Sequence, residues 1–164
     1  MIGFKIAGAV IFVICGIVAS VKLNRKADIV LDGVDSMIGV IRYIKNMVDM
    51  YSLPLPKILD RMKNDTRGKR LLAGCGYCEK ELPCNINEMR SFSFVGDDEV
   101  KGLFCEFLSE FGVGYREEQI KLCERYEELL SERREKISAE LPIKKKRNVT
   151  LCITGTLIPV ILLI

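Results

Sequence analysis

Three closely spaced cysteines are the clearest candidates for chemistry in this chain of 164 residues. They are Cys75, Cys78 and Cys84, in the stretch CGYCEKELPC. A gap of two residues between cysteines suits a metal chelate or a redox pair. A structural zinc site needs four ligands, so Cys105 or Cys123 would have to supply the fourth. A membrane-tethered metal-binding or redox module is therefore our alternative functional hypothesis.

The same cysteines also fit ordinary core packing. Cysteine behaves as a small hydrophobic residue when it is buried. Leu71, Cys75, Cys78 and Leu82 step by 4, 3 and 4 residues, which places them on one face of a helix. A redox pair normally begins a helix beside a β-sheet, and no sheet is predicted here. The spacing favours core packing, and we predict no bound metal and no cofactor.

The chain contains no histidine. This removes the commonest general base, the Ser-His and Cys-His nucleophile systems, and a leading zinc ligand. The glycines are scattered and form no phosphate-binding loop ending in Lys-Ser or Lys-Thr. We therefore predict that the protein is not an enzyme and has no small-molecule substrate.

Charged residues are segregated along the chain, whose formal net charge is +3. All 22 acidic residues lie between Asp28 and Glu140, so both ends are apolar. Residues 6–21 carry no charge, and a helix over residues 6–23 would span about 27 Å, close to the hydrocarbon thickness of a bilayer. A secretory signal peptide is the competing interpretation. Only Lys5 precedes this segment and the other basic residues follow it, which is the reverse of a signal peptide.

The second apolar segment, residues 149–164, would span about 24 Å as a helix. Basic residues before it can snorkel to the interface and extend its reach. A lipid-anchor signal and a buried strand are the competing interpretations, although Gly155 and Pro159 suit a strand poorly. We predict transmembrane helices at 1–23 and 149–164, with one domain at 24–148 between them.

Basic residues flank both apolar segments on the side of the charged domain. They are Lys22, Arg25, Lys26, Lys144, Lys145, Lys146 and Arg147. The positive-inside rule places the central domain in the cytoplasm and both termini on the other side of the membrane. The basic run also suits contact with anionic lipid. Its position against the membrane, without interleaved aromatic residues, argues against nucleic acid.

The central domain is predicted to be an all-α helical bundle. From Leu23 to Tyr51 apolar residues step alternately by 4 and 3, which makes an apolar seam about 40 Å long on one helix. No glycine or proline separates this helix from the first apolar segment. Pro54 and Pro56 mark its end, because proline disfavours a helix interior and restricts the residue before it.

Apolar spacing predicts four further helices. They lie around Leu55–Met62, in RLLAGCGYCEKEL, in EVKGLFCEFLSEF after an N-cap at Asp97 or Asp98, and from Tyr115 to Leu141. Between them NDTRGK is predicted to be a turn, Gly112 and Gly114 to end the third helix, and Pro142 to end the last. The two long helices meet the same membrane face, so we expect them to be antiparallel neighbours.

The order of these features resembles that of the stage III sporulation protein AB family of endospore-forming bacteria. The resemblance covers the whole chain and rests on YIKNMVDMYSLPLPKIL, LSEFGVGYREEQIKLCERYEELL, the basic run and LIPVILLI. The turn before Gln119 looks shorter than in the family. None of these motifs is a catalytic signature, and no catalytic residue is carried over.

The resemblance implies a place in the mother-cell membrane around the forespore, within a channel-like complex that links the two cells. It implies a cytoplasmic domain similar to the platform proteins of type II secretion and type IV pilus machines. Its implied partners are the cytoplasmic ATPase of the sporulation complex and the other membrane subunits. Because the sequence also lacks histidine and a phosphate-binding loop, we predict a non-enzymatic platform subunit. We expect its partner surface on the polar face that carries Arg116, Glu117, Arg125 and Glu128.

Overall fold

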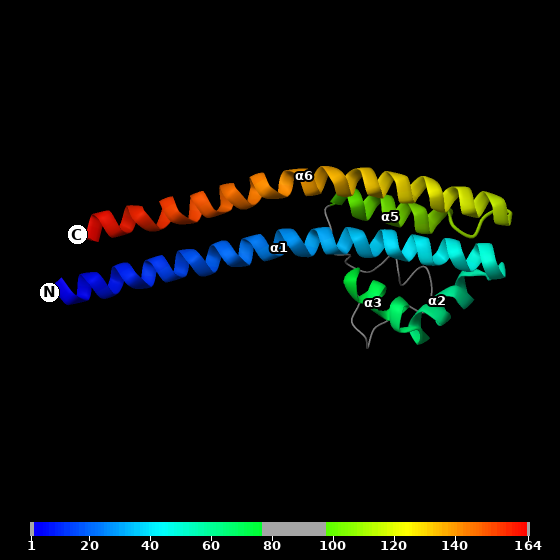
Figure 1. The fold of residues 1–164 in the computed structure, drawn as a ribbon, viewed down its shortest axis with the longest axis horizontal. Helices are drawn as coiled ribbons and strands as arrows, with labels where there is room; N and C mark the ends of the chain where they lie inside the picture. Colours follow the sequence, from blue (N-terminus) through cyan, green and yellow to red (C-terminus); the bar gives the residue numbers. More distant parts are fainter. Residues whose placement is uncertain (1, 77–97, 164) are drawn as a thin grey trace. The chain divides into compact units, whose positions relative to one another are not determined.

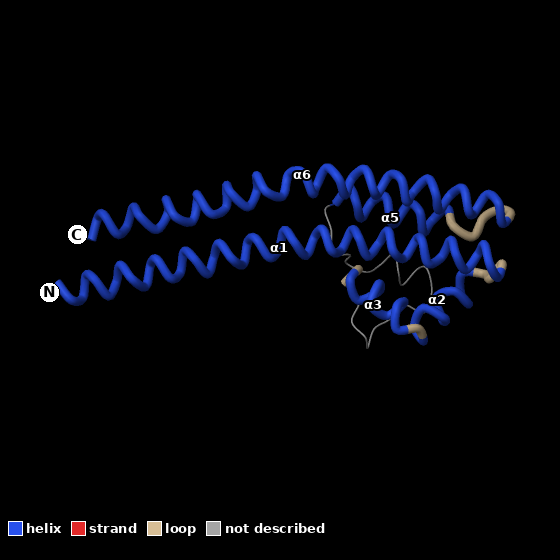
Figure 2. Tube along the Cα trace, in the orientation of Figure 1, coloured by secondary structure: helices blue, strands red, loops and turns tan. Residues whose placement is uncertain are grey.

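The computed structural model is all-α in its described part, which comprises residues 2–76 and 98–163 (Figure 1). Within these ranges, the side chains of 2–10, 12, 13 and 156–163 are not described. No strand occurs among the described residues (Figure 2). The helices are α1 (Ile2–Tyr51), α2 (Leu55–Asn64), α3 (Thr66–Gly74), α5 (Asp98–Glu110) and α6 (Arg116–Leu163). The predicted fold class is confirmed as far as its helical character.

The chain divides into two compact units. Residues Ile29–Lys136 form the larger unit, while Met1–Asp28 and Ile137–Ile164 form the smaller one. The larger unit contains α2, α3 and α5 together with parts of the two long helices. The predicted transmembrane segments fall in the smaller unit.

Helix α1 runs without a break from Ile2 to Tyr51, which confirms the predicted continuity with the apolar start of the chain. Its seam is buried over Val34–Val48, whereas Tyr51 is exposed. Ser52 ends the helix with φ 48°, a left-handed conformation in which its N–H donates to the Val48 carbonyl at 3.0 Å. The prolines that follow prevent the helix from continuing, as predicted.

Helices α2 and α3 pack against each other and against α1. The apolar face of α2 is buried as its spacing predicts, through Leu55, Ile58, Leu59 and Met62. A methyl group added at Gly74 in α3 would lie 2.7 Å from the Cβ of Ser36 in α1. Glycine therefore allows the close approach of α3 to α1.

The predicted turn at NDTRGK is wrong, because α3 begins inside it. Only Asp65 is extended, and its carboxylate accepts a hydrogen bond from the Gly68 N–H at 3.3 Å. This N-cap satisfies a free donor of the first turn and lets the chain re-enter a helix at once. Helix α3 ends at Gly74, and Gly76 follows with φ 103°. The helix predicted in RLLAGCGYCEKEL is therefore wrong at Cys75 and Gly76, where the chain turns, and its remainder from residue 77 lies outside the described residues.

Helix α5 contributes an aromatic cluster to the core of the larger unit. The Phe107 ring lies 6.2 Å from Phe104, 5.4 Å from Phe111 and 5.6 Å from Tyr126 of α6, measured between centroids. Phe104, Phe107 and Tyr126 are fully buried. The chain then turns through Gly112 and Gly114, whose φ values of 97° and 117° suit glycine, as the sequence predicts.

Helix α6 does not end at Pro142, as the sequence predicts, but continues to Leu163. Proline removes one backbone donor, so the Ser138 carbonyl loses its usual helical partner. The rest of the helix supplies hydrogen bonds on both sides of that gap, because helix propagation is cooperative. Buried Ile137 and Leu141 hold the turn before the proline in place. The free-energy cost of the hydrogen bond lost at Pro142 is therefore smaller than the stabilisation from the surrounding helix and its packing.

The smaller unit pairs the beginning of α1 with the end of α6. The Lys145 ammonium lies 2.6 Å from the Asp28 carboxylate, which joins the two helices. Large apolar side chains project outward, such as Ile11 (61% exposed), Ile17 (59%) and Leu151 (62%). Among the described residues, no helix combines the length and the apolar character needed to cross a bilayer.

Candidate interaction surface

Four ion pairs join α1 to α6 within the larger unit, and we call them the α1–α6 ladder. They are Asp35–Arg134 at 2.8 Å, Arg42–Glu127 at 2.6 Å, Lys45–Glu124 at 3.1 Å and Asp49–Arg116 at 2.6 Å. The Arg134 guanidinium donates to both oxygens of Asp35, and this hydrogen bonding raises the pKa of Arg134. The ladder makes the two long helices antiparallel neighbours in this unit, as the sequence predicts.

The ladder also specifies the register of the two helices. From Asp35 to Arg42 to Lys45, α1 advances by 7 and then 3 residues. Their partners Arg134, Glu127 and Glu124 go back along α6 by the same 7 and 3 residues. A slip of one heptad would place Asp35 against Glu127 in one direction and Arg42 against Arg134 in the other. Both arrangements bring like charges together, which is unfavourable. The order of signs thus selects one register among those that the apolar seam allows.

Arg116, one of the predicted partner residues, is used inside the protein. Its guanidinium donates to the Val48 carbonyl at 3.4 Å, and to the Asp49 carbonyl and carboxylate at 2.6 Å each. These carbonyls belong to the last turn of α1, where the helix dipole favours a cation. Arg116 therefore caps α1 from the first residue of α6, and about half of its side chain remains exposed.

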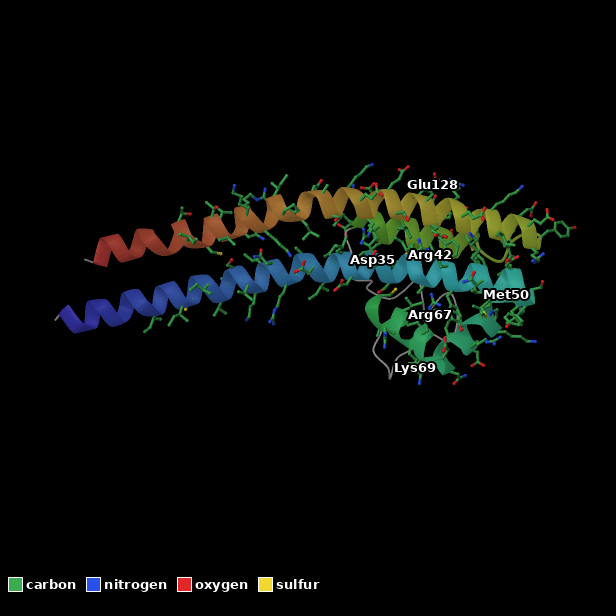
Figure 3. The ribbon with its side chains drawn as sticks, in the orientation of Figure 1. Asp35, Arg42, Met50, Arg67, Lys69 and Glu128 are labelled. Atoms are coloured by element: carbon green, nitrogen blue, oxygen red, sulfur yellow. The ribbon has the colours of Figure 1, made fainter. Side chains whose placement is uncertain are left out.

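The other predicted partner residues lie on the exposed side of α6. Glu117, Arg125 and Glu128 are all exposed, and Glu128 projects from α6 away from α1 in Figure 3. The Arg125 guanidinium lies 5.5 Å from the centre of the Tyr126 ring. These three residues are free to meet a partner, and their role stays a prediction.

The last turn of α1 and the loop before α6 expose apolar side chains at one end of the larger unit. Met50 is 73% exposed, Tyr51 53%, Val113 80% and Tyr115 83%. We call these four residues the apolar end. Beside them lies a groove of about 520 Å³. It is lined by Val48 of α1, the Ser52–Pro54 loop, the start of α2, the Phe111–Val113 loop and the first turn of α6. Clustered exposed apolar groups often mark interaction sites. The sequence analysis did not predict this surface, although Val113 and Tyr115 alternate with the glycines of the turn.

A second groove, of about 510 Å³, lies between α1 and the α2–α3 pair, and we call it the basic groove. It is lined by Tyr43, Asn46, Met47, Arg61, Asn64, Asp65 and Arg67. The Arg61 guanidinium stacks over the Tyr51 ring at 4.8 Å from its centre. The sequence analysis missed this groove, although Leu55–Gly74 contains six basic and two acidic residues. Only the tertiary structure places Tyr43 and Asn46 of α1 opposite them.

The predicted membrane-flanking basic residues come together in the smaller unit. Lys145 pairs with Asp28 of α1, and Lys144 pairs with Glu140 one turn earlier in α6, at 2.7 Å. Lys22, Arg25, Lys26, Lys146 and Arg147 are exposed and form no ion pair with a described residue. Most of the positive charge around the two apolar segments is therefore not paired with a described carboxylate.

The cysteine hypothesis rests on residues that the structure describes only in part. Cys75 is fully buried, and burial raises the pKa of its thiol to about 12. Cys123 is also buried, and desolvation raises its pKa to about 12. A thiolate is the form that binds metal or attacks a disulfide, and burial disfavours it. Cys78 and Cys84 lie outside the described residues. Within the described part, no three potential ligand side chains cluster as a metal site.

Comparisons with known proteins found no similar protein. Searches with family models, among curated proteins and among solved structures each found no match. The resemblance in the sequence analysis therefore stays a prediction.

Proposed function

We propose that the protein is a non-enzymatic membrane platform subunit, in which a helical bundle binds partners and two apolar segments anchor it. The observation that carries this proposal is the α1–α6 ladder. It locks together, in one register, the two helices that lead into the two apolar segments. A chain built in this way is suited to holding a bundle at a membrane.

The proposed membrane arrangement has two spans, at residues 1–23 and 149–164. Exposed apolar side chains along both segments support it, because lipid would cover them. The exposed basic residues beside the segments support a cytoplasmic location for the central domain, with both termini outside. They also support contact with anionic lipid headgroups.

The proposed setting is the sporulation channel complex in the mother-cell membrane around the forespore. The support is the resemblance in sequence to the stage III sporulation protein AB family. The partners would be the cytoplasmic ATPase and the other membrane subunits of that complex. The exposed Glu117, Arg125 and Glu128, together with the apolar end, offer binding surfaces on the larger unit.

Affinity capture of the tagged full-length chain from sporulating cells tests this function. We expect the ATPase and other membrane subunits of the complex to be recovered after detergent extraction. The matched control is a chain in which Asp35 and Arg42 are both reversed in charge, which disrupts the ladder while keeping the net charge. Failure of the folded wild-type chain to recover either kind of partner would contradict the proposal.

The alternative of a metal-binding or redox module is less well supported. Its first cysteine, Cys75, is buried with a raised pKa, which disfavours the reactive thiolate. Metal analysis of the purified chain separates the two hypotheses. Stoichiometric zinc that disappears in Cys75→Ser would favour the alternative.

A further inference from the structure

The α2–α3 pair carries an excess of positive charge, most of it on exposed side chains. Its exposed basic residues are Lys57, Arg61, Arg67, Lys69 and Arg70, and none forms an ion pair with a described residue. Figure 3 shows Arg67 and Lys69 on this pair, on the side of α1 opposite α6. By contrast, all four basic residues of the α1–α6 ladder are paired with carboxylates. Among the described residues, these five cations therefore have no carboxylate partner, which leaves them available to an anionic ligand.

The basic groove gives this charge a defined binding geometry. Arg61 and Arg67 line it from α2 and α3, and Asn46 lines it from α1. Tyr43, which is 9% exposed, closes the floor. The Tyr43 pKa is raised chiefly by burial and then by Asp65, while Arg61 and Arg67 oppose the rise, so all three charges face this tyrosine. The groove therefore offers guanidinium, amide and hydroxyl donors around one space.

We propose that the basic groove is a docking site for an acidic segment of a partner protein. A carboxylate side chain can bind an arginine through two parallel hydrogen bonds. This geometry fixes the orientation of the carboxylate in addition to attracting its charge. Arg61 is held in place by its stacking on Tyr51, so little side-chain entropy remains to be lost on binding. The remaining cations around the groove would attract the acidic residues next to the anchor.

Two other anionic partners fit the surface less well. A membrane-inserting face needs large apolar side chains, and none of those in the described residues 55–76 is exposed. Single-stranded nucleic acid needs a row of exposed aromatic rings for stacking. Here Tyr43 is buried, and the half-exposed Tyr51 already stacks with Arg61. The one acidic residue in the lining, Asp65, already accepts the Gly68 N–H as the N-cap of α3. A flexible protein segment can place its carboxylates on the arginines and avoid Asp65.

The test measures binding of a short labelled peptide in which Asp and Glu alternate with Gly and Ser. The full-length chain is purified in a neutral detergent, and affinity is followed by fluorescence anisotropy. We expect saturable binding that weakens as salt is raised. In Arg61→Gln/Arg67→Gln, the Kd should rise at least about tenfold, because each charge-assisted hydrogen bond contributes at least that factor.

The matched control is Lys121→Gln/Lys136→Gln. It removes two exposed cations from α6, which lies away from the basic groove, and gives the same net charge. We expect its Kd for the acidic peptide to stay within about twofold of wild type, since only long-range screened attraction is lost. Circular dichroism checks that each variant is folded. If the first variant unfolds, Lys69→Gln/Arg70→Gln replaces it, with a smaller expected rise in Kd, because these exposed cations follow Arg67 in α3 but do not line the groove.

Several outcomes would overturn the inference. One is no binding of the acidic peptide by the folded chain at low salt. Another is an equal loss in the groove variant and the α6 control, which would indicate unspecific attraction. A third is equal binding of a control peptide with Asn and Gln in place of the acids. A fourth is tight, saturable binding of inorganic phosphate that excludes the peptide, which would assign the groove to a phosphate ligand.

The inference deepens the proposed function, since it names the chemistry of the partner, but the two can fail separately. Affinity capture with Arg61→Gln/Arg67→Gln distinguishes them. If this variant binds no acidic peptide but recovers the ATPase fully, the docking role of the groove fails and the platform function stands. If the wild-type chain binds the peptide but recovers no member of the complex, the groove stands and the platform function fails.

Discussion

The guanidinium of Arg116, the first residue of α6, holds the carbonyl and the carboxylate of Asp49 in the last turn of α1, at 2.6 Å each. One side chain thus joins the beginning of one long helix to the end of the other. It compensates carbonyl groups that α1 cannot satisfy within itself.

We expect Arg116→Ala to destabilise the bundle by about 1 kcal/mol. The loss is small because the side chains of Arg116 and Asp49 are both about half exposed, so water screens their interaction. Arg116→Lys should recover only part of the loss, because an ammonium cannot reproduce the planar fork. Thermal unfolding followed by circular dichroism checks this. Arg125→Ala, at an exposed position that makes no ion pair with a described residue, is the control. An unchanged melting temperature in Arg116→Ala would contradict the capping role.

The ladder predicts a charge-swap rescue at Arg42 and Glu127. Arg42→Glu or Glu127→Arg alone places like charges where the pair is now 2.6 Å apart, and each should lower stability by about 1 kcal/mol. The double exchange restores opposite charges and should recover most of that loss. A double-mutant cycle by chemical denaturation measures the coupling. Strictly additive effects would show that this pair contributes nothing to register.

Alkaline pH should unfold the larger unit. The pKa values of Cys75 and Cys123 are raised by burial from 9.0 to about 12, and that of Tyr126 from 10.0 to about 12. A raised pKa contributes stability that is complete below the unfolded value and is lost as pH rises toward the folded value. Stability should therefore fall progressively from about pH 9 to pH 12.

Melting temperatures measured across that range test this titration, and they should change little between pH 6 and pH 8, where no histidine can titrate. The pH dependence should become shallower in Cys75→Ala/Cys123→Ala. A thiol reagent at neutral pH should label Cys105, which is partly exposed, before either buried cysteine. Equal labelling rates for all three would contradict the burial.

Two glycines in helices should respond in opposite ways to alanine. A Cβ at Gly68 would lie 2.6 Å from the backbone Cα of Met62, so Gly68→Ala should destabilise by about 1–3 kcal/mol. A Cβ at Gly102 in α5 meets no atom within 4 Å, and Gly102→Ala should stabilise by about 0.5–1 kcal/mol through helix propensity. Denaturant midpoints compare the pair. A stabilised Gly68→Ala would show that α2 and α3 are not packed as described.

The proposed topology predicts that a reporter fused after Ile164 lies outside the cytoplasm. A reporter inserted between Gly112 and Gly114, in the exposed turn before α6, should lie inside it. Paired reporters active on opposite sides of the membrane measure both positions in living cells. A cytoplasmic signal from the reporter after Ile164 would remove the second span, although the bundle could persist.

Local patterns in the sequence predicted most of the helices in the described part. The seam of α1, the buried face of α2, the prolines after Tyr51 and the glycine turn before α6 all depend on neighbouring residues. Three local predictions were wrong. One is the helix in RLLAGCGYCEKEL, which stops at Gly74 before a turn at Cys75 and Gly76. A single N-cap at Asp65 restarted a helix where a turn was expected, and cooperative hydrogen bonding carried α6 through Pro142.

By itself, the sequence determined that the protein is helical, has segregated charge and lacks histidine chemistry, because composition and periodicity are properties of adjacent residues. The tertiary structure decided which charges meet. Asp35 and Arg134 are 99 positions apart, and no local rule pairs them. It likewise decided that Arg116 binds the last turn of α1, while Arg61 and Arg67 share a groove with Tyr43. Such partners depend on the register of packed helices, which is set by the whole core at once.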